Sequence, residues 1–158
     1  MIGAVVARKA IAKAFDALNR HDLTTFLSAW ADDGVFVYPG EISASGTFKG
    51  KHAVEGWFRG FFDQFPRIQF DVQDICVRNI FAFTGTNVVA VHWNIQLTNR
   101  GGRAGQNSGV TVISIKGGRV VHVKDYIFDL GDNFKLNWSA TTQELKSSHL
   151  TQTKGEHK

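Results

Sequence analysis

The sequence predicts an α+β domain in which helices cover one face of an antiparallel sheet. Up to about residue 65, apolar residues recur at helical spacing, whereas from Ile68 onward they alternate with polar residues. Helical segments come first and strand-like segments follow, an order typical of α+β folds. At 158 residues the chain is most simply one domain. We expect this domain to span residues 1–138, followed by a polar, mobile C-terminal tail over residues 139–158.

Two helices are predicted near the N-terminus. The first covers residues 4–20, where Ala7, Ile11 and Leu18 fall on one stripe. The second begins after Asp22, a residue type that caps helix N-termini, and its apolar pattern continues to Trp30. A short strand is expected to follow it, before a Gly- and Ser-rich loop.

A third predicted helix, residues 53–65, ends at Pro66 because proline cannot donate the hydrogen bond that continues a helix. One broad face of this helix is aromatic. Either these side chains fill the core or they line a ligand cavity, and we name them as candidate substrate contacts: Trp57, Phe58, Phe61 and Phe62.

The second half of the chain predicts a meander of long strands. Period-2 alternation covers residues 68–83, 88–98, 107–116 and 119–128, with turn residues between them. In the strand from residue 88, both the odd and some of the even positions are apolar. If helices cover one sheet face, the other needs a second cover. We therefore expect a homodimer formed through the sheet.

Composition excludes several classes of function. The net charge is +4, but Lys and Arg are scattered, so we expect no nucleic-acid partner. Cys76 is the only cysteine, which rules out an intrachain disulfide and a Cys-based metal site, and we expect no metal and no cofactor. The first apolar run is too short for a signal peptide or a membrane span. A cytoplasmic protein without a membrane partner is expected.

Asp125, on the last predicted strand, is the candidate catalytic residue. If Val121 and Val123 point into the protein, period 2 directs Asp125 to the same face. A carboxylate that points into the protein costs folding free energy unless it is hydrogen-bonded, ion-paired or in contact with water in a cavity. A partly desolvated carboxylate has a raised pKa and is a better base at neutral pH. The alternative is a structural ion pair with His92 or Arg119.

Several segments resemble the SnoaL-like proteins of the nuclear transport factor 2-like superfamily, which includes ketosteroid isomerases, limonene epoxide hydrolases and polyketide cyclases. The resemblance spans about residues 5–130 and rests on Phe15–Pro39, Gly46–Phe58, Val88–Gln96 and Gly118–Asp129. It implies a conical half-barrel: a curved antiparallel sheet wrapped around three N-terminal helices and an apolar pocket, usually in a dimer.

The resemblance also indicates which reactions of the superfamily the residues of this chain would support. The tyrosine, aspartate base and neutral acid of ketosteroid isomerases would fall at Ala14, Tyr38 and near Thr111, so none of the three is kept. The Arg-x-Asp pair of limonene epoxide hydrolases becomes His92-Trp93-Asn94, although Asp125 matches their last-strand aspartate. The polyketide cyclases fit better, with a last-strand aspartate that works beside a histidine.

We therefore expect a cofactor-free acid–base enzyme, of the polyketide-cyclase or isomerase type, that acts on a small apolar carbonyl compound. Asp125 would be the base and His92 the acid, while Tyr38 and Asn94 would orient the substrate. Asn107 and Thr111 share a parity and would line one wall. The alternatives are a non-catalytic ligand-binding or dimerisation domain and an epoxide hydrolase.

Overall fold

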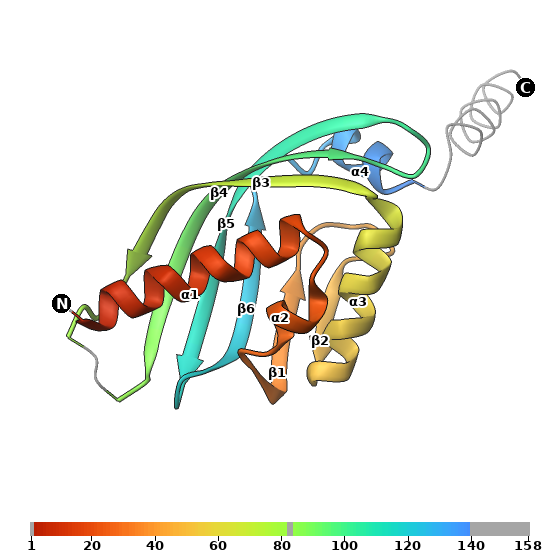
Figure 1. Cartoon of the computed structure of the whole chain (residues 1–158). Coiled ribbons are helices and arrows are strands. Elements are labelled where there is room, and N and C mark those ends of the chain that lie inside the picture. The colour runs from red at the N-terminus through yellow and green to blue at the C-terminus, as the bar shows by residue number, and fades with distance from the viewer. Residues whose placement is uncertain (1, 82–83, 140–158) are drawn as a thin grey trace, which may run out of the picture.

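The α+β fold is confirmed by a computed structural model of the chain, which describes residues 2–81 and 84–139 (Figure 1). The elements, in chain order, are α1 (Ile2–Asn19), α2 (Leu23–Leu27), β1 (Trp30–Tyr38), β2 (Gly46–Lys49), α3 (Lys51–Gln64), β3 (Arg67–Val77), β4 (Asn87–Thr98), β5 (Ala104–Lys116), β6 (Arg119–Ile127) and α4 (Asp132–Trp138). No helix in these described ranges combines the length and the hydropathy needed to cross a membrane.

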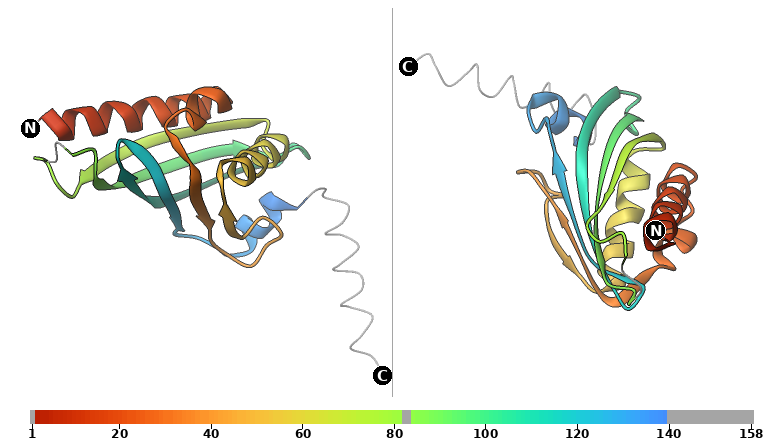
Figure 2. Two further views of the ribbon diagram at one scale, coloured as in Figure 1. Left: turned by 90° about the horizontal axis from the view of Figure 1, so that it is seen from below. Right: turned by 90° about the vertical axis from the view of Figure 1, so that its left-hand side faces the viewer.

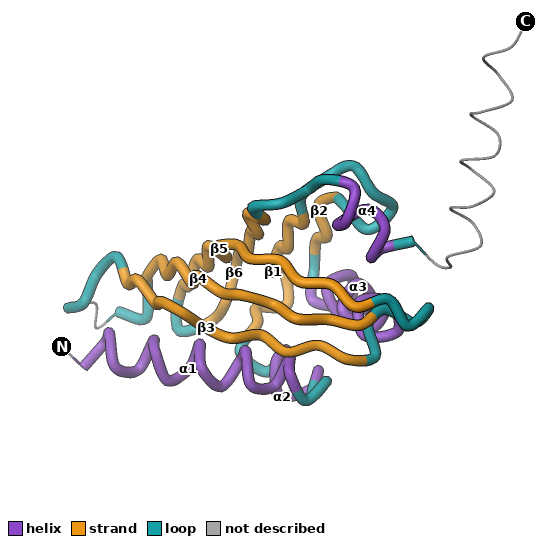
Figure 3. Tube along the Cα trace, turned by 90° about the horizontal axis from the view of Figure 1, so that it is seen from above, coloured by secondary structure: helices purple, strands orange, loops and turns teal. Residues whose placement is uncertain are grey.

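The six strands form one curved, open sheet in the order β2-β1-β6-β5-β4-β3. Neighbouring strands are antiparallel except β1 and β6, which run parallel. Helices α1, α2 and α3 lie on the concave side of the sheet (Figure 2). Helix α1 runs along β3 (Figure 3), and the short α4, which follows β6 in the chain, contacts β5. The core therefore lies between the helices and the concave face.

Helix α1 is fixed to the sheet by its last residue. The Asn19 side chain donates from Nδ2 to the Phe70 carbonyl oxygen at 3.0 Å and accepts from the Phe70 N–H at 2.6 Å. After it, Asp22 caps α2, as the sequence predicts, by accepting a hydrogen bond from the Thr25 N–H at 3.0 Å. These contacts hold the end of α1 and the start of α2, the two segments that precede β1.

The element boundaries differ from the sequence prediction in three places. Helix α2 ends at Leu27, and Trp30 instead begins β1, where it pairs with Val120. Residues 46–49, expected in a loop, pair with β1 as β2. Strand β3 ends at Val77, short of the predicted end at residue 83, and residues 82–83 of that prediction lie outside the described residues. For Trp30 and for residues 46–49, pairing with another strand decided the outcome, and local propensity did not.

The C-terminal part also differs, because α4 was not predicted. Of the expected tail, only Ser139 lies within the described residues, and its N–H donates to the Lys135 and Leu136 carbonyl oxygens at the end of α4. The rest of the expected tail, residues 140–158, lies outside the described residues.

A β-bulge in β6 changes which of its side chains face the interior, compared with the sequence prediction. The β5–β6 register shifts so that Ser114 pairs with His122 and Ile115 with Val120. As a result Val120 and Val123 both line the interior, while Val121 does not. Past the bulge the alternation resumes, so Asp125 does face inward.

Gly109 lets the Trp93 indole lie across β5. The two residues are paired in the β4–β5 register, and a Cβ on Gly109 would stand 2.9 Å from Trp93 Cζ2 and 2.5 Å from the Tyr126 carbonyl oxygen. We predict that Gly109→Ala lowers the free energy of unfolding by about 1–3 kcal/mol and disturbs the Trp93 near-UV circular dichroism.

The matched control for this substitution is Gly60→Ala in α3, where an added Cβ meets nothing within 4 Å. Because alanine is the better helix former, this variant should gain up to about 1 kcal/mol in urea unfolding. Equal effects from the two substitutions would contradict a close packing role for Gly109.

Candidate active site

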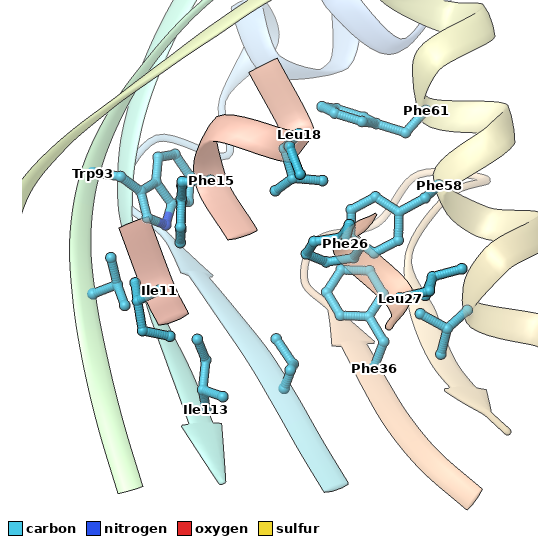
Figure 4. Close-up of a cluster of buried hydrophobic side chains, with 14 of the residues drawn as sticks. Ile11, Phe15, Leu18, Phe26, Leu27, Phe36, Phe58, Phe61, Trp93 and Ile113 are labelled. Carbon is cyan, nitrogen blue, oxygen red and sulfur yellow. The ribbon is translucent and has the colours of Figure 1, made fainter. Parts of the chain in front are cut away.

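The concave side of the sheet encloses a cavity of about 160 Å³ with predominantly apolar walls. Side chains from α1 and β4, including Phe15 and Trp93, face Phe26, Phe36 and Phe58 across the interior (Figure 4). An apolar cavity of roughly 150 Å³ can hold a benzene-sized molecule. The space therefore fits a small apolar ligand.

Three polar side chains form a row across this apolar surface. In the parallel β1–β6 ladder, Phe36 pairs with Val123 and Val37 with Lys124, so the residues that follow, Tyr38 and Asp125, stand side by side. On the other side Asp125 is paired with Thr111 of β5. Tyr38, Asp125 and Thr111 all line the cavity.

The direction of the hydrogen bonds at Asp125 follows from donor chemistry. Trp93 Nε1 carries only a donor, so it donates to Thr111 Oγ1, at 2.8 Å. The Thr111 hydroxyl is then oriented to donate its own proton to Asp125 Oδ1, at 2.6 Å. Among the described residues, no hydrogen bond reaches the second oxygen, Oδ2. That oxygen remains able to accept a proton from a ligand.

The surroundings of Asp125 raise its pKa to about 7, because burial penalises the charged carboxylate, while the Thr111 hydrogen bond acts in the opposite direction. At neutral pH the carboxyl group is therefore near its midpoint. A carboxylate with this pKa is a much stronger base than an exposed aspartate and is still ionised in part.

Tyr38 provides a neutral O–H donor next to Asp125. Burial, together with the nearby Asp125 charge, raises the pKa of the Tyr38 phenol well above its usual value, so the phenol keeps its proton. Trp138 Nε1 donates to the Tyr38 oxygen at 3.2 Å. Since this oxygen accepts from Trp138, its own proton is free to be donated into the cavity.

Two expected site residues lie on the wrong face of the sheet. Trp93 and Ile95 point into the cavity, so the alternation of β4 sends His92 and Asn94 to the outer face. There His92 Nδ1 lies 3.5 Å from Asp74 Oδ2, and Asn94 is exposed. The prediction of His92 as the acid partner and of Asn94 as a substrate contact was wrong.

Most of the other predicted site residues line the cavity, but Phe62 does not. Trp57, Phe58 and Phe61 line the cavity, as does Asn107, whose Nδ2 also donates to the Asp129 carbonyl oxygen at 2.7 Å. Phe62 does not line it, because it stacks on the His21 ring with centroids 4.3 Å apart. The structural ion pair considered for Asp125 is not formed: Arg119 instead donates to the Ser28 carbonyl oxygen.

Sequence reasoning missed Trp93, Asn137 and Trp138 as site residues. Trp93 carried a usable signal, since an indole N–H on an inward strand position needs an acceptor. Asn137 and Trp138 carried none, because α4 was not predicted. Within residues 2–81 and 84–139, no group of three His, Cys, Asp or Glu side chains could hold a metal ion.

The fold and the site define an α+β protein with a carboxylate inside a largely apolar cavity. The SnoaL-like domain family matches residues 11–123, and the chain belongs to this family. No curated protein matches the sequence.

Solved structures share the fold at low sequence identity. Bal32a, from a soil-derived mobile gene cassette, is 18% identical with a TM-score of 0.71, over 84% of this chain and 95% of that one. A candidate polyketide cyclase of Xanthomonas campestris is 16% identical with a TM-score of 0.65, over 84% and 96%. Mycobacterium tuberculosis RV0760c, in complex with estradiol-17β-hemisuccinate, is 21% identical with a TM-score of 0.62, over 76% and 92%.

Proposed function

We propose that the protein is a cofactor-independent acid–base enzyme that acts on a small, largely apolar carbonyl compound, by isomerisation or intramolecular cyclisation. The observation that supports it best is the pairing of Asp125, whose pKa is about 7, with the neutral Tyr38 phenol in one apolar cavity. A base and a hydrogen-bond donor placed together are what proton removal beside a carbonyl requires.

In the proposed reaction, Asp125 Oδ2 takes the proton from the carbon next to the substrate carbonyl. The electron pair of that C–H bond moves toward the carbonyl oxygen, and the Tyr38 O–H stabilises the developing enolate by a hydrogen bond. Isomerisation follows if the substrate also carries a C=C bond conjugated with the enolate, so that the protonated Asp125 returns the proton to the far carbon of this dienolate. Cyclisation follows if the enolate carbon attacks a second carbonyl of the same molecule and the new alkoxide takes the proton.

Two features support this class of substrate. The walls are hydrocarbon and aromatic, and the cavity volume of about 160 Å³ corresponds to a single ring with a short substituent. Among the structural neighbours, one is described as a candidate polyketide cyclase and another holds estradiol-17β-hemisuccinate. Epoxide hydrolysis is less well supported, because the residues that would replace its Arg-x-Asp pair, His92 and Asn94, face away from the cavity.

The proposal can be tested without knowing the product. Cyclohexanone and other monocyclic ketones are incubated with the protein in D₂O, and loss of the proton signal beside the carbonyl is followed by NMR. We expect the protein to accelerate this exchange above the buffer rate. Ketones that bind with no acceleration would instead support the alternative of a non-catalytic ligand-binding protein.

We further propose that the protein is a homodimer through the outer face of the sheet. On this face Phe128 is 62% exposed and Tyr126 48% exposed, and the His92 ring lies 6.0 Å from the Phe128 ring. Helices α1 to α3 all lie on the concave side (Figure 2). A second copy presents the same apolar face and is always available at equal concentration.

Light scattering at micromolar concentration should therefore give twice the chain mass of 17.5 kDa. Phe128→Lys should shift the mass toward that of the monomer, because it places a charge in the interface. The matched control is Phe81→Lys, since Phe81 is 63% exposed but lies in the turn after β3. A wild-type monomer would contradict the proposal.

A further inference from the structure

Asn137 of α4, a residue that lines the cavity, carries a buried and unpaired amide oxygen. The residue is only 7% exposed, and Oδ1 has no hydrogen-bond partner among the described residues. Among the side-chain oxygens and nitrogens of the described ranges that are fully closed to solvent, it is the only one without a partner, and such groups are rare because each costs about 1–3 kcal/mol.

The position of Asn137 is held by specific contacts. Its backbone carbonyl oxygen accepts from Gln64 Nε2 at 2.8 Å and from Asn99 Nδ2 at 3.2 Å, and both donors belong to buried side chains. The side-chain amide lies against Gly105, where an added Cβ would overlap it. The backbone of Asn137 is thus held in place, and its side-chain amide packs against Gly105.

The same helix connects Asn137 to the proposed reaction site. The next residue, Trp138, donates to the Tyr38 oxygen, and its ring packs against Phe65 with centroids 4.9 Å apart. Helix α4 therefore carries both the donor to Tyr38 and the unpaired Asn137 oxygen, and both residues line the cavity.

We propose that Asn137 Oδ1 accepts a hydrogen bond from a hydroxyl group of the ligand, so that the substrate is a carbonyl compound carrying a hydroxyl away from the reacting carbonyl. The inference rests on the proposed function, which supplies the carbonyl. A site that holds an unpaired acceptor discriminates strongly between a ligand that donates to it and an analogue that does not. Asn137 thereby selects the substrate, and Asp125 acts on it.

The test measures binding of cyclohexanone and of its 3- and 4-hydroxy derivatives to the full-length protein by NMR. We expect at least one hydroxy ketone to bind about tenfold more tightly than cyclohexanone, as one buried hydrogen bond allows. Asn137→Asp, which keeps the acceptor, should retain the preference, whereas Asn137→Leu should abolish it. Asn94→Leu, on the outer face, should leave it unchanged.

Several results would overturn this inference. Equal binding of all the ketones would mean that water, and not the ligand, hydrogen-bonds to Asn137 Oδ1. Loss of the preference in Asn137→Asp would mean that the amide nitrogen faces the ligand. Failure of every hydroxy ketone to bind would also count against it. Because binding is measured, Asp125→Asn should retain the preference even if no proton exchange is found, which separates this inference from the proposed function.

Discussion

Replacing Asp125 by asparagine is expected to reduce proton exchange on ketones by about 10²- to 10⁴-fold, the usual contribution of a general base. The fold should be retained, because asparagine has the same shape and its Oδ1 can still accept the Thr111 hydroxyl. Asp74→Asn serves as the matched control, since that carboxylate lies on the outer face with its side chain 74% exposed. An unchanged exchange rate in Asp125→Asn would remove Asp125 from the mechanism.

The pH dependence of exchange should report the same carboxyl group. Burial raises the pKa of Asp125 to about 7, and only the ionised form is a base. The rate should therefore rise with pH, reach half of its maximum near pH 7 and level off above it. A rate that is already constant from pH 5 upward would indicate a carboxylate with an ordinary pKa.

Stability should change with pH in the opposite direction. Between pH 4 and 7 the folded state keeps the Asp125 proton, whereas the unfolded chain, with a pKa near 3.8, has released it. The folded state binds more protons in this window, so stability falls as the pH rises through it. In urea unfolding, Asp125→Asn should gain on the order of 2–4 kcal/mol relative to wild type between pH 4 and pH 8.

Thr111→Val is expected to have the second largest effect. Its hydroxyl donates to Asp125 and accepts from Trp93, so the isosteric valine removes both hydrogen bonds at once. Because the Thr111 hydrogen bond lowers the pKa of Asp125, its loss should move the midpoint of the rate profile to higher pH. The unpaired Trp93 N–H should cost about 1–3 kcal/mol of stability.

Thr111→Ser is the conservative variant for this experiment, since it keeps the hydroxyl and should restore the wild-type midpoint. A purely structural role for Thr111 would lower stability without moving the midpoint. Near-identical pH profiles for the valine and serine variants would therefore contradict the Trp93–Thr111–Asp125 chain, even if the valine variant were less stable.

The sequence was sufficient to predict the fold and the position of Asp125, for identifiable reasons. Alternation along β6 survives past the bulge at Val121, so Asp125 keeps the inward parity expected for it. Thr111, the residue paired with Asp125, was expected on the same wall because it shares a parity with Asn107. Both inferences depend only on the two-residue period of strands.

The errors have a different origin. Period 2 separates His92 and Asn94 from Trp93, but it does not say which set faces inward when both faces of a sheet carry apolar residues. The resemblance favoured the polar set, whereas in the structure the apolar set faces inward, with the Trp93 indole packed against Gly109. Helix α4 lacks a side-chain N-cap and is held by tertiary contacts of Trp138. No local sequence pattern therefore predicts this helix.

The most direct test of the account is a titration of the Asp125 carboxyl carbon by ¹³C NMR, with Asp125→Asn used to assign the signal. Because burial raises the pKa of Asp125, its signal should titrate near pH 7 and be absent from the variant. A signal for Asp125 that titrates near pH 4 would contradict the buried base on which the proposed chemistry depends.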